Sequence, residues 1–331
     1  NEFYYTSNEE SPMTSGGIQD RPKGKKMKLS NQPGTNSPIF SSSMKYFMNK
    51  FTSLDTPMLI TLNDNTGKVL KTLVTNDKLK QKLAEYAIPQ KEFFTFKTTE
   101  GVDLNGWMMK PVNFDPAKRY PVLMFQYSGP GSQQVLDKWG ISWETYMASL
   151  GYVVACVDGR GTGGRGSEFQ KCTYLNLGVK EAKDQVEAAK YLGGLPYVDK
   201  GRIGIWGWSF GGYMTIMSMS EGTPVFKAGV AVAAPTDWKY YDTVYTERFM
   251  RNAERKMPKA IKQLQHSAVQ TTCTVTCSLY TVWQMIMFTS RTVQNMQSTW
   301  YNSENSSICR YTPTGIIASM VEIPVTTCIR S

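Results

Sequence analysis

The chain has 331 residues, 41% of them hydrophobic and 12% aromatic, which is enough to build the core of one large domain or two smaller ones. It contains no run of about 18 apolar residues, which excludes a membrane-spanning helix from this sequence. The formal net charge of +10 is not gathered into basic clusters interleaved with aromatic residues, so we expect no nucleic-acid partner.

Residues 1–88 have the pattern of short antiparallel strands. Runs rich in β-forming residues, such as "PMLITLNDNTGKVLKTLV", are separated by turn residues. The stretch Asn63–Gly67 lies between two such runs and predicts a hairpin turn. This succession of strands is typical of a meandering sheet, and we interpret it as the end of a β-propeller.

Residues 89–250 change to an alternation of strands and helices. The segments "YPVLMFQYSG" and "GYVVACVDGRG" are continuous apolar runs that end in glycine-rich turns, as expected for strands covered on both faces. Between them "WGISWETYMASLG" predicts a helix, and a further apolar helical stripe begins at Val179. The pattern predicts an α/β fold with a doubly wound, mostly parallel sheet.

Residues 251–331 differ from the rest of the chain. They contain no Asp and one Gly, whereas the preceding 250 residues contain 26 Gly. They carry 8 basic and 3 acidic residues, and no helical or strand periodicity persists in them. Cys273 and Cys277 lack a second pair of ligands, so we predict no metal site. We expect this segment to be irregular.

The strongest chemical motif is "GWSFG", Gly207 to Gly211. A strand-like run precedes it and "GGYMTIMSMSE" predicts a helix after it. A serine between two glycines at this spacing is typical of a nucleophile elbow, in which the hydroxyl is presented on a sharp strand-to-helix turn. We therefore predict that Ser209 is a nucleophile.

Four motifs together resemble the prolyl oligopeptidase family of serine peptidases: "GWSFGGYMT", "YSGPGSQ", "DGRGTGGRG" and "YYDTVYTERFM". Within that family they are most similar to the bacterial dipeptidyl peptidase IV group. The resemblance covers Asn1 to about Met250 and implies an α/β-hydrolase domain preceded by propeller strands.

The resemblance implies a role for six residues of this chain. Ser209 matches the nucleophile, and the backbone N–H of Phe210 and the hydroxyl of Tyr127 match the two halves of the oxyanion hole. Trp238, Tyr241 and Tyr245 match residues that line the pocket for the proline ring of the substrate. We interpret Asp158 and Arg160, in a glycine-rich loop, as fixing that loop.

The resemblance also implies how such a protein acts. Its substrates are peptides with a penultimate proline, from which it releases X-Pro dipeptides by acyl transfer, and it needs no cofactor. It implies a possible homodimer and a location in the cell envelope or outside the cell. Two alternative hypotheses are that the chain is another α/β-hydrolase, such as an esterase or acylaminoacyl peptidase, or that it is a non-catalytic remnant.

The catalytic acid and base that should follow the nucleophile are missing. The family places them in loops resembling Ala-Asp-Asp-Asn-Val and Asn-His-Gly, and neither occurs after Ser209. The only histidine is His266, and a triad built from it with Asp237 or Asp242 is disfavoured because both aspartates belong to the pocket motif.

A shifted reading frame accounts for this gap. Codons for "VWQMIMF", residues 282–288, can encode Ala-Asp-Asp-Asn-Val when read from the last base of each codon, with Ala, the second Asp and Val forced, and the same offset allows His at Ile316-Ile317. We therefore predict that residues 251–331 are the C-terminal segment of the family read out of frame. His266 then has no catalytic role, and the chain as written is inactive.

Overall fold

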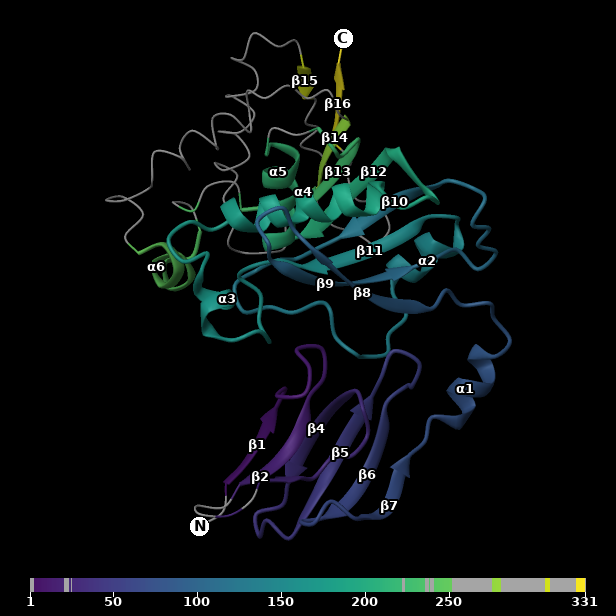
Figure 1. The fold of residues 1–331 in the computed structure, drawn as a ribbon, viewed down its shortest axis with the longest axis vertical. Coiled ribbons are helices and arrows are strands. Elements are labelled where there is room, and N and C mark those ends of the chain that lie inside the picture. The colour runs from purple at the N-terminus through teal and green to yellow at the C-terminus, as the bar shows by residue number, and fades with distance from the viewer. Residues whose placement is uncertain are drawn as a thin grey trace, which may run out of the picture. The chain divides into compact units, whose positions relative to one another are not determined.

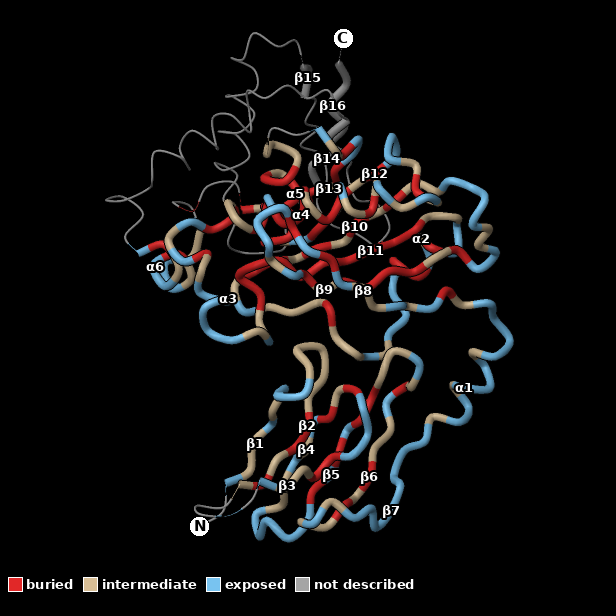
Figure 2. Tube along the Cα trace, in the orientation of Figure 1, coloured by how far each residue is buried: buried red, intermediate tan, exposed pale blue. Residues whose placement is uncertain are grey.

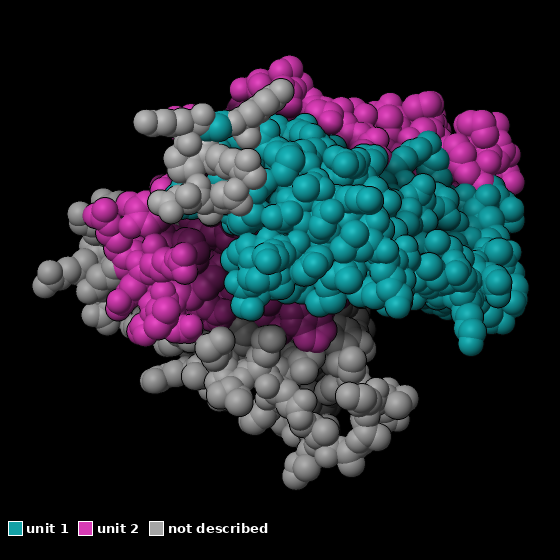
Figure 3. All heavy atoms as spheres, turned by 90° about the horizontal axis from the view of Figure 1, so that it is seen from below, with its two compact units in different colours: residues 1–92, 109–113, 135–150 teal, residues 93–108, 114–134, 151–331 magenta. Residues whose placement is uncertain are grey.

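The computed structural model describes residues 3–20, 24, 26–221, 224–235, 238 and 241–251, together with the backbone of 276–280, 307–309 and 326–330 (Figure 1). The chain divides into two compact units, which Figure 3 distinguishes by colour. Unit 1 comprises residues 1–92, 109–113 and 135–150, and unit 2 comprises the remainder. In the described part of the chain, no helix is both long enough and apolar enough to cross a membrane.

Unit 1 contains two antiparallel sheets. The first has the order β1-β2-β3 and the second β4-β5-β6-β7. Their bounds are β1 Phe3–Ser7, β2 Gly16–Asp20, β3 Met27–Lys28, β4 Thr35–Phe40, β5 Tyr46–Thr52, β6 Leu59–Asp64 and β7 Val69–Val74. Helices α1 (Asp77–Leu83) and α2 (Trp143–Ser149) also belong to this unit. The meander expected for the first 88 residues is therefore observed.

The hairpin between β6 and β7 shows why the sequence turns there. The Asp64 carboxylate accepts hydrogen bonds from the backbone N–H and the hydroxyl of Thr66 and from the N–H of Lys68. These hydrogen bonds lower the pKa of the Asp64 carboxyl. Gly67, between Thr66 and Lys68, has φ 88°, a left-handed conformation that costs glycine little, so the predicted turn is confirmed.

The sheet of nine strands has the order β15-β16-β14-β13-β12-β10-β11-β9-β8 among the described residues. Its members are β8 Lys91–Lys97, β9 Asp103–Met109, β10 Tyr120–Phe125, β11 Val153–Asp158, β12 Val198–Trp208, β13 Ala228–Val232, β14 Thr276–Tyr280, β15 Ser307–Cys309 and β16 Thr326–Arg330. The adjacent strands from β11 through β10, β12 and β13 to β14 pair in parallel. This is the parallel centre that the apolar runs predicted.

Helices cover the parallel strands. The remaining helices are α3 Ser167–Lys171, α4 Val179–Gly193, α5 Phe210–Met219 and α6 Thr243–Met250. Helix α4 packs against β12, and α5 packs against β12 and β13 (Figure 1). Every residue of β11 is buried, as expected for a strand covered on both faces (Figure 2).

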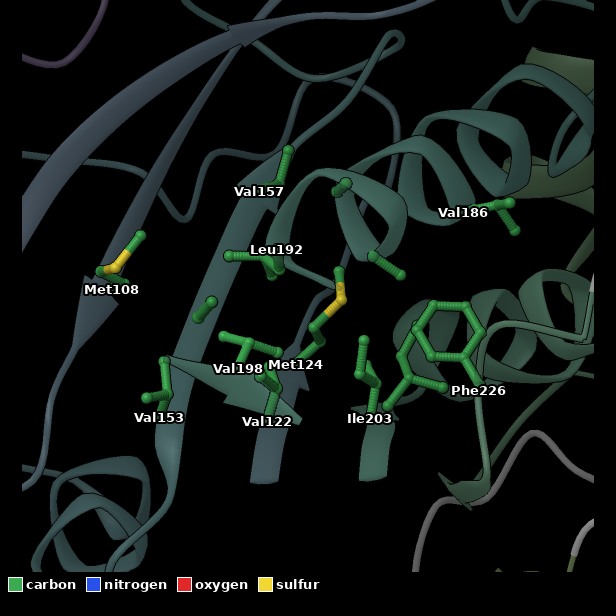
Figure 4. Packing of buried hydrophobic residues seen from close by; sticks show 14 of the residues in the cluster. Met108, Val122, Met124, Val153, Val157, Val186, Leu192, Val198, Ile203 and Phe226 are labelled. Atoms are coloured by element: carbon green, nitrogen blue, oxygen red, sulfur yellow. The ribbon is translucent and has the colours of Figure 1, made fainter. Parts of the chain in front are cut away.

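The main core of unit 2 lies between α4 and the sheet (Figure 4). Met124 and Val153 from the strands and Leu192 from α4 are fully buried there. Tyr191 of α4 stacks on Phe96, with ring centroids 4.7 Å apart, and extends this core toward β8. The packing fixes α4 and the strands as one framework, and the loops at the carboxyl ends of the strands are built on it.

A buried ion pair anchors the loop after β11. The Arg160 guanidinium donates to both carboxylate oxygens of Asp184 in α4, with the shortest contact at 2.7 Å, and also to Glu100. Asp184 is fully buried, and the carboxylates hold the pKa of Arg160 above its usual value. Asp158 accepts the backbone N–H of Gln134. The loop-fixing roles expected of Asp158 and Arg160 are thus confirmed.

Three strands of segment 251–331 join the sheet. β14 lies parallel to β13, and β16 pairs antiparallel with both β14 and β15. His266 and residues 284–286 and 316–317 lie outside the described residues. The shifted reading frame therefore stays a prediction.

We expect Asp184→Asn to destabilise the fold by about 3 kcal/mol, because it leaves a buried guanidinium with its main carboxylate partner neutralised. The matched control is Asp199→Asn. It breaks the Asp199–Arg202 pair, which has the same 2.7 Å contact but is solvent-exposed, so it should lower the free energy of unfolding far less than Asp184→Asn does. Urea denaturation of both variants checks this, and equal losses would contradict it.

Candidate active site

Ser209 occupies a strained turn between β12 and α5. Its backbone has φ 58° and ψ −118°, a combination rarely adopted by a residue with a side chain. The Ser209 N–H donates to the carbonyl of Val232 in β13 at 2.8 Å, which fixes the turn to the neighbouring strand. The residue is half-buried, so the turn presents a serine at the surface of unit 2.

Two glycines make this turn possible. A Cβ added to Gly207 would lie 2.5 Å from the Gly211 carbonyl group and 2.6 Å from the Gln126 carbonyl oxygen. A Cβ added to Gly211 would lie 2.5 Å from that same Gln126 oxygen. All three distances are too short for real contacts, so only glycine lets β12, α5 and the end of β10 approach this closely. The spacing in the sequence therefore has a steric cause.

The groups predicted to hold an oxyanion lie beside the serine. Phe210 is the first residue of α5, and helix geometry gives its N–H no acceptor within the helix. Tyr127 follows β10, which is adjacent and parallel to β12, so both strands end at the same edge of the sheet. The rings of Tyr127 and Phe210 have centroids 6.1 Å apart. The structure thus brings these predicted residues together around Ser209.

An aromatic cluster adjoins this edge. Trp238 lies 5.7 Å from Phe210, 5.6 Å from Tyr241 and 5.9 Å from Tyr245, measured between ring centroids. Trp238 is only 2% exposed, whereas Tyr241 and Tyr245 are half-buried. The two tyrosine rings meet edge to face at 5.3 Å. These two rings form the accessible wall of the cluster, and Trp238 supports them from beneath.

Burial disfavours the ionised form of the two accessible phenols of the cluster. It raises the pKa of Tyr241 and of Tyr245, and the neighbouring Tyr127 adds to both shifts. Neutral phenols remain hydrogen-bond donors, whereas a phenolate would only accept. The cluster can therefore hold an apolar ring while it keeps donors near the serine.

Sequence reasoning missed two residues behind the cluster. Tyr213 of α5 donates to the Leu177 carbonyl at 2.9 Å and packs edge to face on Trp238. Glu181, in the first turn of α4, is fully buried and accepts the Gly178 N–H at 3.0 Å. Burial raises the pKa of Glu181 to about 8. In the sequence "LGVKEA", a glutamate three residues after a glycine indicates the start of a helix, but nothing in it indicates that Glu181 is buried.

The described residues supply no acid–base pair for Ser209. Asp242 caps α6 by accepting the Val244 N–H at 2.9 Å, which gives it a structural use. His266 and Asp237 lie outside the described residues. Within the described part, no group of three His, Cys, Asp or Glu side chains is arranged to hold a metal.

A serine on a strained strand-to-helix turn, at the carboxyl edge of a mostly parallel sheet, defines the α/β-hydrolase class. Residues 139–283 match the model of the prolyl oligopeptidase family, so this stretch of the chain is similar to members of that family.

Known proteins agree with this assignment. A probable dipeptidyl-aminopeptidase B of Trichophyton verrucosum is 40% identical over 257 residues, which are 76% of this chain and 28% of that protein. A probable dipeptidyl peptidase 4 of Aspergillus flavus is 37% identical over 219 residues, 65% of this chain and 28% of that protein.

Two solved structures share the fold. The crystal structure of Porphyromonas gingivalis dipeptidyl peptidase 4 matches with a TM-score of 0.78 and 40% identity, over 91% of this chain and 48% of that one. A putative dipeptidyl aminopeptidase IV from Bacteroides ovatus matches with a TM-score of 0.78 and 32% identity, over 87% and 41%. The expected α/β-hydrolase domain after the end of a β-propeller is confirmed. The chain spans less than half the length of these relatives.

We expect the stability of the fold to fall between about pH 4.5 and pH 8 through Glu181. Its pKa is higher in the folded chain than in the unfolded one, so only the unfolded state gains from ionisation in this range, by about 1.4 kcal/mol per pH unit. Glu181→Gln, which stays neutral, should lose this dependence and become progressively more stable than the parent as pH rises.

Denaturation midpoints at pH 5, 6.5 and 8 measure the effect. Glu168→Gln, in exposed α3, is the control and should follow the parent at every pH. If Glu181→Gln and the parent change in parallel, Glu181 is ionised in the folded state and the interpretation is wrong.

Proposed function

We propose that the chain carries the nucleophile half of a dipeptidyl peptidase IV-like serine peptidase, which releases X-Pro dipeptides from peptide N-termini. The observation that supports this most is the geometry at Ser209: a strained elbow flanked by the Phe210 N–H and Tyr127, with an aromatic wall alongside. Each part has a use in acyl transfer, and the match to the family model agrees with that use.

The proposed reaction begins with attack of Ser209 Oγ on the carbonyl carbon that follows the proline ring. The carbonyl oxygen becomes negative and accepts hydrogen bonds from the Phe210 N–H and the Tyr127 hydroxyl. The serine proton goes to a general base and then to the departing amine as the C–N bond breaks. Water hydrolyses the resulting ester, which releases the dipeptide and restores Ser209.

The aromatic wall favours a peptide over an ester substrate. Proline presents a rigid apolar ring, and the half-buried faces of Tyr241 and Tyr245 offer a matching surface. An esterase has no need of such a pocket. We therefore place the proline ring against these two residues.

The base and acid of the reaction are proposed to lie in the shifted frame. Serine is a poor nucleophile near neutral pH without an adjacent base. The chain as written should therefore hydrolyse a Gly-Pro chromogenic substrate about 10⁴-fold or more slowly than a version in which residues 251–331 are read in the restored frame.

The test expresses both versions with the N-terminal portion that the relatives have. Ser209→Ala in the restored version is the first control and should abolish hydrolysis. Tyr127→Phe in the same version should lower kcat about 10²-fold with little change in KM, because it removes a donor used mainly in the transition state. The proposal fails if the restored protein folds but a fluorophosphonate does not label Ser209.

A further inference from the structure

Three buried polar side chains lie at the segment that carries Tyr127, and the proposed reaction uses none of them. Gln126 directly follows β10, Ser128 lies two residues further on, and Gln185 belongs to the middle of α4. Each is at most 1% exposed. Burying amides and a hydroxyl is unfavourable unless they are hydrogen-bonded, so their presence at this edge needs a reason.

The three side chains form one continuous hydrogen-bonded chain. Gln185 Nε2 donates to the Val157 carbonyl of β11 at 2.9 Å and to Ser128 Oγ at 3.2 Å. Ser128 Oγ in turn donates to Gln126 Oε1 at 3.2 Å. Gln126 Nε2 then donates to the carbonyl of Gly211 at 2.6 Å, inside the elbow. This hydrogen-bonded network therefore links β11, α4 and the segment around Tyr127 to the start of α5.

The backbone is strained at Ser128, the residue whose side chain lies in the middle of the hydrogen-bonded network. Ser128 has φ 59°, a left-handed conformation that a residue with a side chain adopts at a cost of about 1 kcal/mol or more. Such a conformation persists only where the surroundings over-determine it. The hydroxyl of Ser128, held between Gln185 and Gln126, supplies that restraint.

Tyr127 lies between the two restrained residues and faces away from them. Side chains of consecutive extended residues alternate in direction, so Gln126 can point into the buried chain while Tyr127 points toward Phe210. The backbone of Gly129 lies against the tyrosine ring, since a Cβ there would be 2.5 Å from Tyr127 Cε1. The Gly129 backbone, two residues along the same segment, therefore limits the movement of the Tyr127 ring.

We propose that Gln126, Ser128 and Gln185 are positioning residues that hold the Tyr127 hydroxyl beside the Ser209 elbow. This inference rests on the proposed role of Tyr127 as an oxyanion donor. Buried hydrogen bonds restrain the groups they connect, and here they join all three side chains, although Gln185 Oε1 itself has no hydrogen-bond partner among the described residues. An oxyanion donor must occupy its place before charge develops, because reorganisation at that moment would raise the barrier.

The test places 3-fluorotyrosine at position 127 of the full chain and records its ¹⁹F NMR signal, which requires no turnover. The parent should give one narrow resonance. Ser128→Ala should replace it with broadened or multiple resonances. Ser218→Ala is the matched control, because Ser218 is equally buried in α5 but its hydroxyl has no hydrogen-bond partner among the described residues. It should leave the resonance in place.

Gln185→Met is the second variant, and it removes both donated hydrogen bonds while keeping the side-chain length. It should alter the fluorine resonance as Ser128→Ala does. The inference is overturned if either folded variant melts at a lower temperature yet keeps the narrow parental resonance, since the network then only stabilises the fold. Failure of Ser209 to react in the restored-frame protein would instead overturn the proposed function and leave this resonance unchanged.

Discussion

The carbonyl oxygen of Gln126 is the point on which the arrangement at Ser209 depends. It lies so close to Gly207 and Gly211 that neither position can carry a side chain. This contact brings the ends of β10 and β12 and the start of α5 to one place. Because the contact is made by backbone, it holds Ser209, Phe210 and Tyr127 in a fixed relation that side-chain motion alone does not change.

The surrounding framework supports this contact from two sides. On one side the buried network of Gln126, Ser128 and Gln185 ties the segment carrying Tyr127 to α4 and α5. On the other, Tyr213 and Trp238 fill the space behind the elbow helix and support the accessible tyrosines. Strain at the serine is thus offset by packing and hydrogen bonds in the surrounding elements.

Much of this could be predicted from local sequence patterns. Apolar runs identified β10 and β11, and the glycine spacing identified the elbow, because both depend on neighbours in the chain. Gln126, Ser128, Gln185 and Glu181 could not be predicted, since their burial depends on contacts between segments far apart in the sequence. The resemblance named Trp238 as a pocket residue, but only the structure shows that it lies beneath Tyr241 and Tyr245.

We infer that the intact nucleophile elbow belongs with an acid and a base that the gene encodes in another reading frame. The nucleotide sequence of the source gene across codons 248–254 tests it most directly. We expect a one-base insertion or deletion there, beyond which the other frame stays open and encodes Asp at residues 284–286 and His at 316–317. A verified gene with the written frame, and stop codons in the alternative before codon 317, would contradict it.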